Sequence, residues 1–259
     1  MSNNNPIGLF DSGIGGTSIW KEIHELLPNE NTIYLADSKN APYGQKSKEE
    51  IIQLCIKNTE LLLEYNCKLI VVACNTATTN AIKELRAKYA VPFIGIEPAI
   101  KPAATKSETQ TIGILATQGT LNSDLFHQTV ARFQDTKIIE QIGYGLVQLI
   151  ENGELNSPEI DKLLRSYLEP MIEANIDYLV LGCSHYPYLV PQIKKILPKH
   201  IKILDSGEAV AKQTKNILNE KIGFNMQTKK SSQLFYTNAN PKVLSDILKN
   251  KYIVLFKDF

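Results

Sequence analysis

The chain has 259 residues, of which 43% are hydrophobic and 21% are charged. This composition is typical of a folded globular protein with one large or two medium cores, and it argues against disorder. The 28 basic and 27 acidic residues leave a net charge of +1, so neither nucleic acid nor an anionic membrane surface is an expected partner.

The opening residues, MSNNNPIGLF, lack the charged and apolar regions of a signal peptide. No apolar run approaches the roughly 18 residues of a membrane-spanning helix, and we expect a cytoplasmic protein. The sequence holds four cysteines, which are Cys55, Cys67, Cys74 and Cys183. They form no C-x-x-C pair and have no zinc-ligand spacing, so a disulfide scaffold, a thioredoxin-type site and a structural metal are not expected.

The chain is predicted to open with a strand at Pro6–Asp11, a glycine-rich turn at Ser12–Gly16 and a helix at Thr17–Leu27. The turn is not a dinucleotide-binding fingerprint, because Ser18 stands where G-x-G-x-x-G needs its third glycine. The lysine of a P-loop is missing as well. We interpret the segment as a turn that approaches a small anion.

A second strand is predicted at Thr32–Ala36, followed by a long loop at Asp37–Gln45 whose proline and glycine favour unusual backbone geometry. A surface loop without function is equally compatible with this segment. Lys48–Tyr65 has apolar residues at the spacing of an amphipathic helix, which places Cys55 on its core face.

The central stretch of the sequence, Lys68–Ala81, delivers a thiol at the end of a strand. The apolar run Leu69–Val72 leads to Cys74 and a series of small polar residues, and a helix is predicted at residues 81–89. The N–H groups and dipole of a helix that follows such a turn bind carboxylates and favour a thiolate. Cys67, in the turn before the strand, has no polar neighbours of this kind and is interpreted as structural.

A second unit repeats this design. Its strand at Tyr178–Leu181 leads to Cys183, and Ile112–Ser123 matches Ile7–Ser18 as a hydrophobic run that breaks into Gly, Ser and Thr. A single cysteine after an apolar run is usually an inert core residue. A matched pair at equivalent positions of a duplicated unit instead favours a functional interpretation.

The other predicted elements continue the alternation of strands and helices. Pro92–Gly95 is a short strand, and the prolines that follow it mark a crossing between units. Glu151 ends a helix entered through residues 143–145, where it is either functional or a solvated helix residue. Further strands are predicted at residues 137–141, 201–204 and 234–237, and further helices at 125–133, 157–173 (bent or ended by Pro170), 207–218 and 240–248.

This alternation predicts an α/β fold with two similar domains, each built on a mainly parallel sheet. The first domain is predicted to comprise residues 1–97 and 208–259, and the second residues 98–207. Ligands of open parallel sheets bind outside the carboxyl ends of the strands. The predicted active site is therefore a cleft between the two domains.

Such a cleft would carry a thiol on each wall, with Asp11 and Ser12 near Cys74, and His185 two residues after Cys183. Two thiols without metal or disulfide spacing suit proton transfer on opposite faces of one carbon. The reference pKa of a thiol, about 8.5, lets one cysteine be a thiolate while the other is a thiol. A two-base racemase requires this state.

Seven short motifs, in this order, resemble glutamate racemases of the aspartate/glutamate racemase superfamily. They are DSGxGG at 11–16, YxAD at 34–37, PYG at 42–44, ACNT at 73–76, GxEPA at 95–99, LGCSHYP at 181–187 and LDSG at 204–207. The ordered set spans nearly the whole chain and is highly specific. The resemblance implies interconversion of L- and D-glutamate without a cofactor or metal, supplying D-glutamate for bacterial peptidoglycan.

By the same resemblance, Cys74 and Cys183 are the two proton donors and acceptors. Asp11 assists the first cysteine, and His185 and Glu151 assist the second. The partner is a small molecule, L- or D-glutamate, and a homodimer is one expectation for the assembly. The residues implied in substrate binding are Asp11, Ser12, Tyr43, Gly44, Asn75, Thr76, Thr117, Thr120, Ser184 and His185.

The sequence departs from the usual motifs at Ser184, where threonine is common, and at residues 143–145. Serine keeps the hydroxyl and loses a methyl group. All three arginines lie on predicted helices away from the motifs; they are Arg86, Arg132 and Arg165. Backbone N–H groups and hydroxyls at helix N-termini are therefore expected to hold the substrate carboxylates.

Three other functions stay open at this point. An aspartate or other amino-acid racemase of the same superfamily is one, because the cysteine pair fixes the reaction better than the substrate's length. A hydrolase with Cys183 as nucleophile and His185 as its base is another, although it leaves Cys74 unexplained. The last is a carboxylate-binding or regulatory interaction protein, against which the intact cysteines argue.

Overall fold

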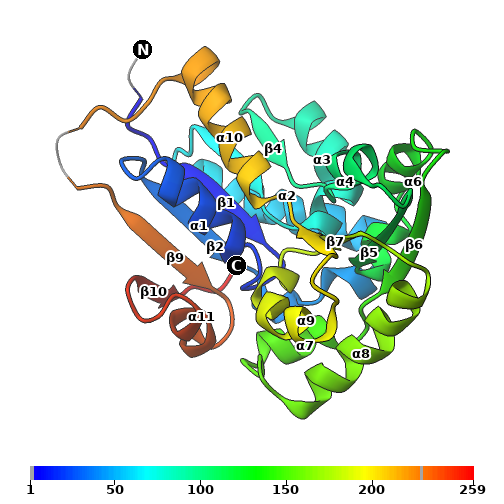
Figure 1. Cartoon of the computed structure of the whole chain (residues 1–259). Helices are drawn as coiled ribbons and strands as arrows, with labels where there is room; N and C mark the ends of the chain where they lie inside the picture. The colour runs from blue at the N-terminus through cyan, green and yellow to red at the C-terminus, as the bar shows by residue number, and fades with distance from the viewer. Residues whose placement is uncertain (1–2, 228–229) are drawn as a thin grey trace.

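Two sheets of parallel strands form the framework of the protein (Figure 1). The structure is a computed structural model that describes residues 3–227 and 230–259. Every strand pair in both sheets is parallel. The predicted α/β class with two mainly parallel sheets is confirmed.

The larger sheet has six strands in the order β10-β9-β2-β1-β3-β4. All residues of β1, β2 and β3 are buried, which explains their continuous apolar sequences. Its strands are β1 (Ile7–Asp11), β2 (Thr32–Ala36), β3 (Leu69–Val72), β4 (Phe93–Gly95), β9 (Gln233–Thr237) and β10 (Ile253–Phe256). The associated helices are α1 (Thr17–Leu26), α2 (Lys48–Glu64), α3 (Asn75–Lys88), α10 (Gly207–Ile217) and α11 (Pro241–Ile247), with short turns η1 (Ser38–Asn40), η2 (Tyr43–Gln45) and η4 (Leu218–Ile222).

The smaller sheet has four strands in the order β6-β5-β7-β8. They are β5 (Thr111–Ala116), β6 (Lys137–Ile142), β7 (Tyr178–Gly182) and β8 (Lys202–Leu204). The helices of this part of the chain are α4 (Ile100–Lys106), α5 (Gln118–Leu121), α6 (Asp124–Val130), α7 (Leu146–Glu151), α8 (Pro158–Glu173) and α9 (Val190–Ile196), together with the turn η3 (Tyr186–Leu189).

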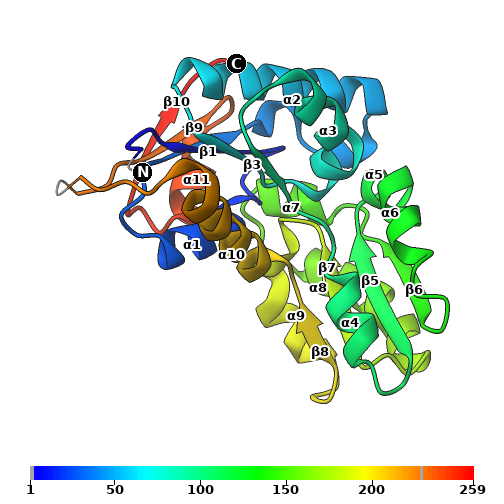
Figure 2. The same ribbon diagram turned by 90° about the horizontal axis from the view of Figure 1, so that it is seen from above.

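The chain passes from the larger sheet to the smaller one after β4 and returns after β8 through α10, which packs against α1. Figure 2 shows the two sheets as separate lobes, with α2 and α3 on one and α4, β5 and β6 on the other. The predicted domain boundaries at residues 97 and 207 stay a prediction. No helix within the described residues combines the length and apolar character needed to cross a membrane.

Several elements differ from those predicted. Helix α3 begins at Asn75 rather than at Ala81, because small polar side chains are well tolerated where the first N–H groups of a helix are free. The edge strand β10 was missed because its four residues, IVLF, are all apolar, so no alternation of polar and apolar residues marks it, although Ile253 and Phe256 are exposed. Helices α4 and α9 were also missed, and Arg132 lies in a turn beyond α6.

The interruption predicted at Pro170 is small. Helix α8 continues through this residue and ends three residues later, at Glu173. A proline close to the carboxyl end removes one N–H from a helix that is already ending. The predicted helix at residues 157–173 is thus confirmed to within one residue.

Candidate active site

Cys74 is the second of the two residues between β3 and α3, and it caps the first turn of the helix. Its Sγ accepts a hydrogen bond from Ala77 N at 3.4 Å, and the thiol donates to Ser12 Oγ across 3.7 Å. The side chain is buried, with 4% of the residue exposed. The predicted position of this thiol in a strand-to-helix turn is confirmed.

The surroundings of Cys74 favour the thiol over the thiolate. Burial and the negative charge of Asp11 raise the pKa of Cys74 far above its ordinary value, against smaller lowering effects of the Ala77 and Ser12 hydrogen bonds. The expectation that the helix terminus favours a thiolate is therefore wrong for Cys74 in this arrangement. One N–H···S hydrogen bond does not compensate for loss of solvent.

Cys55 and Cys67, the two cysteines outside the predicted site, belong to the core. Cys55 is completely buried on α2, and burial raises its pKa well above the ordinary value. Burial also raises the pKa of Cys67 to about 12. Both thiols are therefore protonated at neutral pH, as expected for structural cysteines.

Cys183 directly follows β7 and faces a charged pair of side chains. Its Sγ lies 3.8 Å from His185 Nδ1, and the other ring nitrogen, Nε2, lies 2.5 Å from Glu151 Oε1. Burial alone would lower the pKa of His185. The hydrogen bonds to Cys183 and Glu151, together with the charges of Asp11 and Glu151, outweigh burial and raise this pKa well above its ordinary value.

The carboxylate of Glu151 joins the two lobes. Besides His185 on its own side, it accepts hydrogen bonds from Ile14 N at 2.7 Å and from Ser38 Oγ at 2.8 Å, both on the larger sheet's side. The alternative that Glu151 is a solvated helix residue is therefore wrong. The contacts with Ile14 and Ser38 were not predicted, because no local pattern marks partners more than a hundred residues apart.

The glycine-rich turn after β1 is shaped to receive these side chains. A Cβ atom at Gly13 would lie 1.9 Å from Glu151 Oε1, and one at Gly15 would lie 2.2 Å from His185 Nδ1. Only glycine permits so close an approach. The turn's Ile14 N–H donates to the carboxylate of Glu151. The approach of this turn to a small anion stays a prediction.

Asp11 is fully buried at the end of β1. It accepts hydrogen bonds from Gly13 N at 2.9 Å and from Ser184 Oγ at 2.8 Å, so it also connects the two lobes. Burial raises its pKa, while the charge of His185 lowers it in part. Ser184 thus uses the hydroxyl that it shares with threonine.

Both predicted catalytic cysteines line one narrow cavity between the lobes, which contains about 230 Å³ of empty volume. Asp11, Glu151 and Thr120 lie behind this lining, and Thr120 Oγ1 contacts Thr76 Oγ1 at 3.2 Å. The lining residues are Ser12, Pro42, Tyr43, Gly44, Cys74, Asn75, Thr76, Thr117, Val147, Cys183, Ser184 and His185.

The side chain of Asn75 is the clearest candidate for contact with a bound molecule. The residue is 1% exposed, and neither its amide nitrogen nor its oxygen has a hydrogen-bond partner among the described residues. Buried polar groups are normally hydrogen-bonded. The lining contains no lysine or arginine, and no cluster of His, Cys, Asp or Glu within the described residues is arranged to hold a metal ion.

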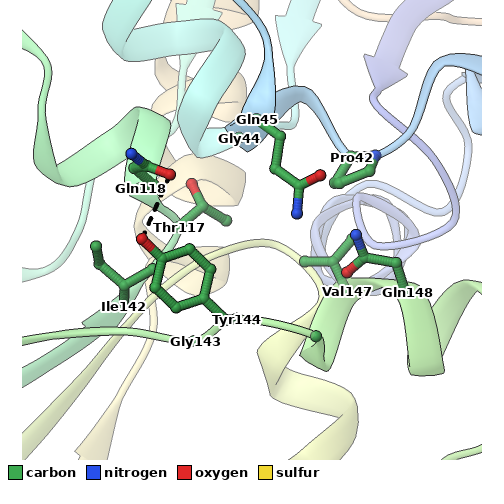
Figure 3. Close-up of a pocket in the computed structure, with 11 residues that line it drawn as sticks. Pro42, Gly44, Gln45, Thr117, Gln118, Ile142, Gly143, Tyr144, Val147 and Gln148 are labelled. Atoms are coloured by element: carbon green, nitrogen blue, oxygen red, sulfur yellow. Dashed lines mark hydrogen bonds between the residues drawn. The ribbon is translucent and has the colours of Figure 1, made fainter.

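A second cavity of about 290 Å³ adjoins the first one and shares Pro42, Gly44, Thr117 and Val147 with it. Its other side chains are mainly uncharged and polar, and Figure 3 shows the Tyr144 hydroxyl pointing toward Gln118, 3.5 Å away. Tyr144 is half exposed, so this cavity reaches the surface. It was not predicted, since its residues come from separate segments of both lobes and only Pro42 and Gly44 belong to one of the motifs.

Comparison with protein families defines the class of this chain. A family model described as Asp/Glu/Hydantoin racemase matches residues 7–214. The matched region contains both cysteines, Glu151, His185 and every residue of the cavity lining. The fold and the site define a racemase, an enzyme of the isomerase class.

Individual relatives narrow this class. The glutamate racemase of Ralstonia pickettii is 49% identical over 208 residues, which are 80% of this chain and 74% of that protein. The Escherichia coli glutamate racemase in complex with L-glutamate and the activator UDP-MurNAc-Ala superimposes with a TM-score of 0.86 at 33% identity, covering 98% of both chains. The Francisella tularensis enzyme in complex with D-glutamate gives 0.85 at 29% identity, covering 99% and 97%. The chain belongs to the aspartate/glutamate/hydantoin racemase family, in which these relatives are glutamate racemases.

Proposed function

We propose that the chain interconverts L- and D-glutamate by proton transfer to and from two thiols, without a cofactor. The observation that carries this proposal is the shared cavity, to which the larger sheet contributes Cys74 and the smaller sheet contributes Cys183. Racemisation removes a proton from one face of the α-carbon and returns one to the other. Thiols on facing walls suit this reaction.

In one direction, the Cys183 thiolate takes the α-proton while the Cys74 thiol gives its proton to the opposite face of the carbon. The reaction ends with a thiol at Cys183 and a thiolate at Cys74, and the other direction reverses each transfer. The protonated His185 ring compensates negative charge on Cys183 Sγ. On the other wall, Ala77 N–H donates a hydrogen bond to Cys74 Sγ. This hydrogen bond stabilises the negative charge that forms on that sulfur.

The polar lining is proposed to hold the substrate carboxylates. Asn75 and Thr76 open α3, where free N–H groups and the helix dipole attract anions. The Asn75 amide and the hydroxyls of Ser12 and Thr117 supply further hydrogen bonds. These contacts also stabilise the negative charge that spreads from the α-carbon into the carboxylate during proton transfer.

Several further features rest on the family resemblance. We propose that D-glutamate made by the chain supplies peptidoglycan synthesis in the cytoplasm. We also propose the two domains with boundaries at residues 97 and 207, and the assisting roles of Asp11, His185 and Glu151. Glutamate is favoured over aspartate because the relatives at 42–49% identity are glutamate racemases.

Circular dichroism tests the proposal directly. The purified protein, dialysed against a chelator and given no cofactor, is incubated separately with L-glutamate, D-glutamate and both enantiomers of aspartate. We expect the signals of L-glutamate and of D-glutamate, which are opposite in sign, both to decay to zero, and the aspartate signals to persist. Decay of aspartate alone would assign the enzyme to the other substrate, and activity that needs added metal or pyridoxal phosphate would contradict the cofactor-free mechanism.

A further inference from the structure

Ser38 contacts the proposed acid–base machinery from the opposite lobe. It lies in η1, the first turn of the loop that follows β2, whereas Glu151 ends α7 in the other lobe. The Ser38 hydroxyl donates a hydrogen bond to Glu151 Oε2 at 2.8 Å. The serine is partly buried, and it lies outside the cavity lining.

The two oxygens of the Glu151 carboxylate have different partners. Oε1 accepts from Ile14 N and faces His185 Nε2, while Oε2 accepts from Ser38. A carboxylate fixed at both oxygens cannot rotate freely about its last torsion. The Ser38 hydroxyl therefore keeps Oε1 in the plane and direction in which it meets the imidazole.

We propose that Ser38 is a positioning residue for the half of the reaction that uses Cys183, acting through Glu151 and His185. The contacts form one series, from Ser38 to Glu151 at 2.8 Å, to His185 at 2.5 Å and to Cys183 Sγ at 3.8 Å. This inference rests on the proposed two-thiol function.

The same loop links this series to the substrate. Ser38 is near its start, and Tyr43 and Gly44, near its end, line the cavity. Placement of the loop against the substrate and alignment of Glu151 therefore depend on one segment. The hydrogen-bond partners of Cys74, by contrast, are Ser12 and Ala77 N, so loss of the Ser38 hydroxyl is expected to affect one thiol far more than the other.

Racemisation itself cannot reveal such a one-sided effect, because the equilibrium constant between enantiomers is one and kcat/KM must be equal in both directions. An irreversible half-reaction can. With L- or D-3-chloroglutamate, a thiolate takes the α-proton, chloride leaves C3 and a C2=C3 double bond forms. The enamine product takes up water and breaks down to 2-oxoglutarate and ammonium, which are measured. Cys74→Ser and Cys183→Ser first establish which enantiomer each thiol deprotonates.

For Ser38→Ala, we expect kcat/KM of elimination to fall about tenfold for the enantiomer that Cys183 deprotonates, as for loss of a hydrogen bond to a charged group. The other enantiomer should react within about twofold of the wild-type rate, and Ser38→Thr, which keeps a hydroxyl, should restore the lost activity. The matched control is Ser18→Ala, which removes another hydrogen bond between the lobes, from Ser18 Oγ to the Ser184 carbonyl at 2.9 Å. Its effect should be equal for both enantiomers.

A double mutant tests the route of the effect. If Ser38 acts through Glu151, Ser38→Ala should cause little further loss in a Glu151→Gln background. An equal loss for both enantiomers, no loss at all, or full additivity with Glu151→Gln would overturn the role of Ser38. If Cys74→Ser and Cys183→Ser do not prefer opposite enantiomers, the two-thiol function itself fails, which is a separate result.

Discussion

The Nε2 atom of His185 lies 2.5 Å from Oε1 of Glu151, while its Nδ1 atom faces Cys183 Sγ. Both ring nitrogens are engaged, and the contacts with Cys183 and Glu151 outweigh burial and raise the pKa of His185 well above its ordinary value, which favours the cationic ring. The other thiol, Cys74, is buried next to Asp11, and burial together with the negative charge of Asp11 raises its pKa. The two walls of the cavity are therefore electrostatically unequal, with the cation beside Cys183 and the protonated thiol at Cys74.

Replacement of either cysteine tests the two-thiol mechanism. Cys74→Ser and Cys183→Ser should each abolish racemisation, since a serine hydroxyl is far too weakly acidic to hold an anion near pH 7. Glutamate should still bind, because Asn75 and the α3 terminus remain. Circular dichroism measures turnover and calorimetric titration measures binding. Racemisation near the wild-type rate by either variant would end the two-thiol mechanism.

Deuterium oxide tests whether the thiols act from opposite faces. The thiol that returns the proton has exchanged with solvent, so the product enantiomer should carry deuterium at Cα. Substrate recovered early in the reaction should carry little. Mass spectrometry after separation of the enantiomers gives both values. Product that keeps the original proton would indicate a single base that works on both faces.

Asp11→Asn and His185→Asn should lower turnover by about 10²–10⁴-fold, the usual contribution of acid–base assistance. Each change removes a charge next to a cysteine and keeps a side chain of similar polarity. Thermal unfolding and far-ultraviolet circular dichroism serve as controls for the fold. Wild-type turnover in a well-folded variant would remove that residue from the proposed machinery.

The raised pKa of His185 predicts a pH dependence of stability. A histidine whose pKa is higher in the folded state stabilises the fold fully below its unfolded pKa of about 6.5. This contribution is lost as the pH rises through the folded-state pKa, by at most about 1.4 kcal/mol per pH unit. Urea unfolding of the wild type and His185→Asn from pH 5.5 to 9.5 measures the difference, which should shrink with rising pH. A constant or growing difference would contradict the assignment.

Asn75→Ala should separate binding from stability. Because the Asn75 amide has no partner among the described residues, its removal should change the free energy of unfolding little. The KM for glutamate should rise about 10- to 100-fold, since a buried hydrogen bond to a charged carboxylate is lost.

The matched control is Asn80→Ala on the same helix. Its amide bonds Thr76 O and Gly119 O at 2.9 Å, so this change should cost about 1 kcal/mol of stability. A KM unchanged in Asn75→Ala would exclude the amide from the binding site.

The sequence predicted those features that depend on local patterns. The apolar runs before Cys74 and Cys183 identified β3 and β7, and the rule for parallel sheets brought their ends to one site. Contacts across the lobes, such as Ser38 with Glu151, depend on how two folded units meet, and no short stretch of sequence encodes them. The pKa of Cys74 was missed because its burial and the charge of Asp11, which a sequence pattern does not reveal, outweigh the local helix terminus.

The glycines after β1 also limit how this site can change. An alanine at Gly15 is only one methyl group larger, yet its Cβ would overlap the imidazole of His185 at 2.2 Å. At Gly13 the same methyl would overlap the Glu151 carboxylate. The distance between the two walls therefore depends on the absence of side chains at Gly13 and Gly15 as much as on the side chains of Glu151 and His185. Substitution at either position would have to displace the Glu151 or the His185 side chain from its place in the site.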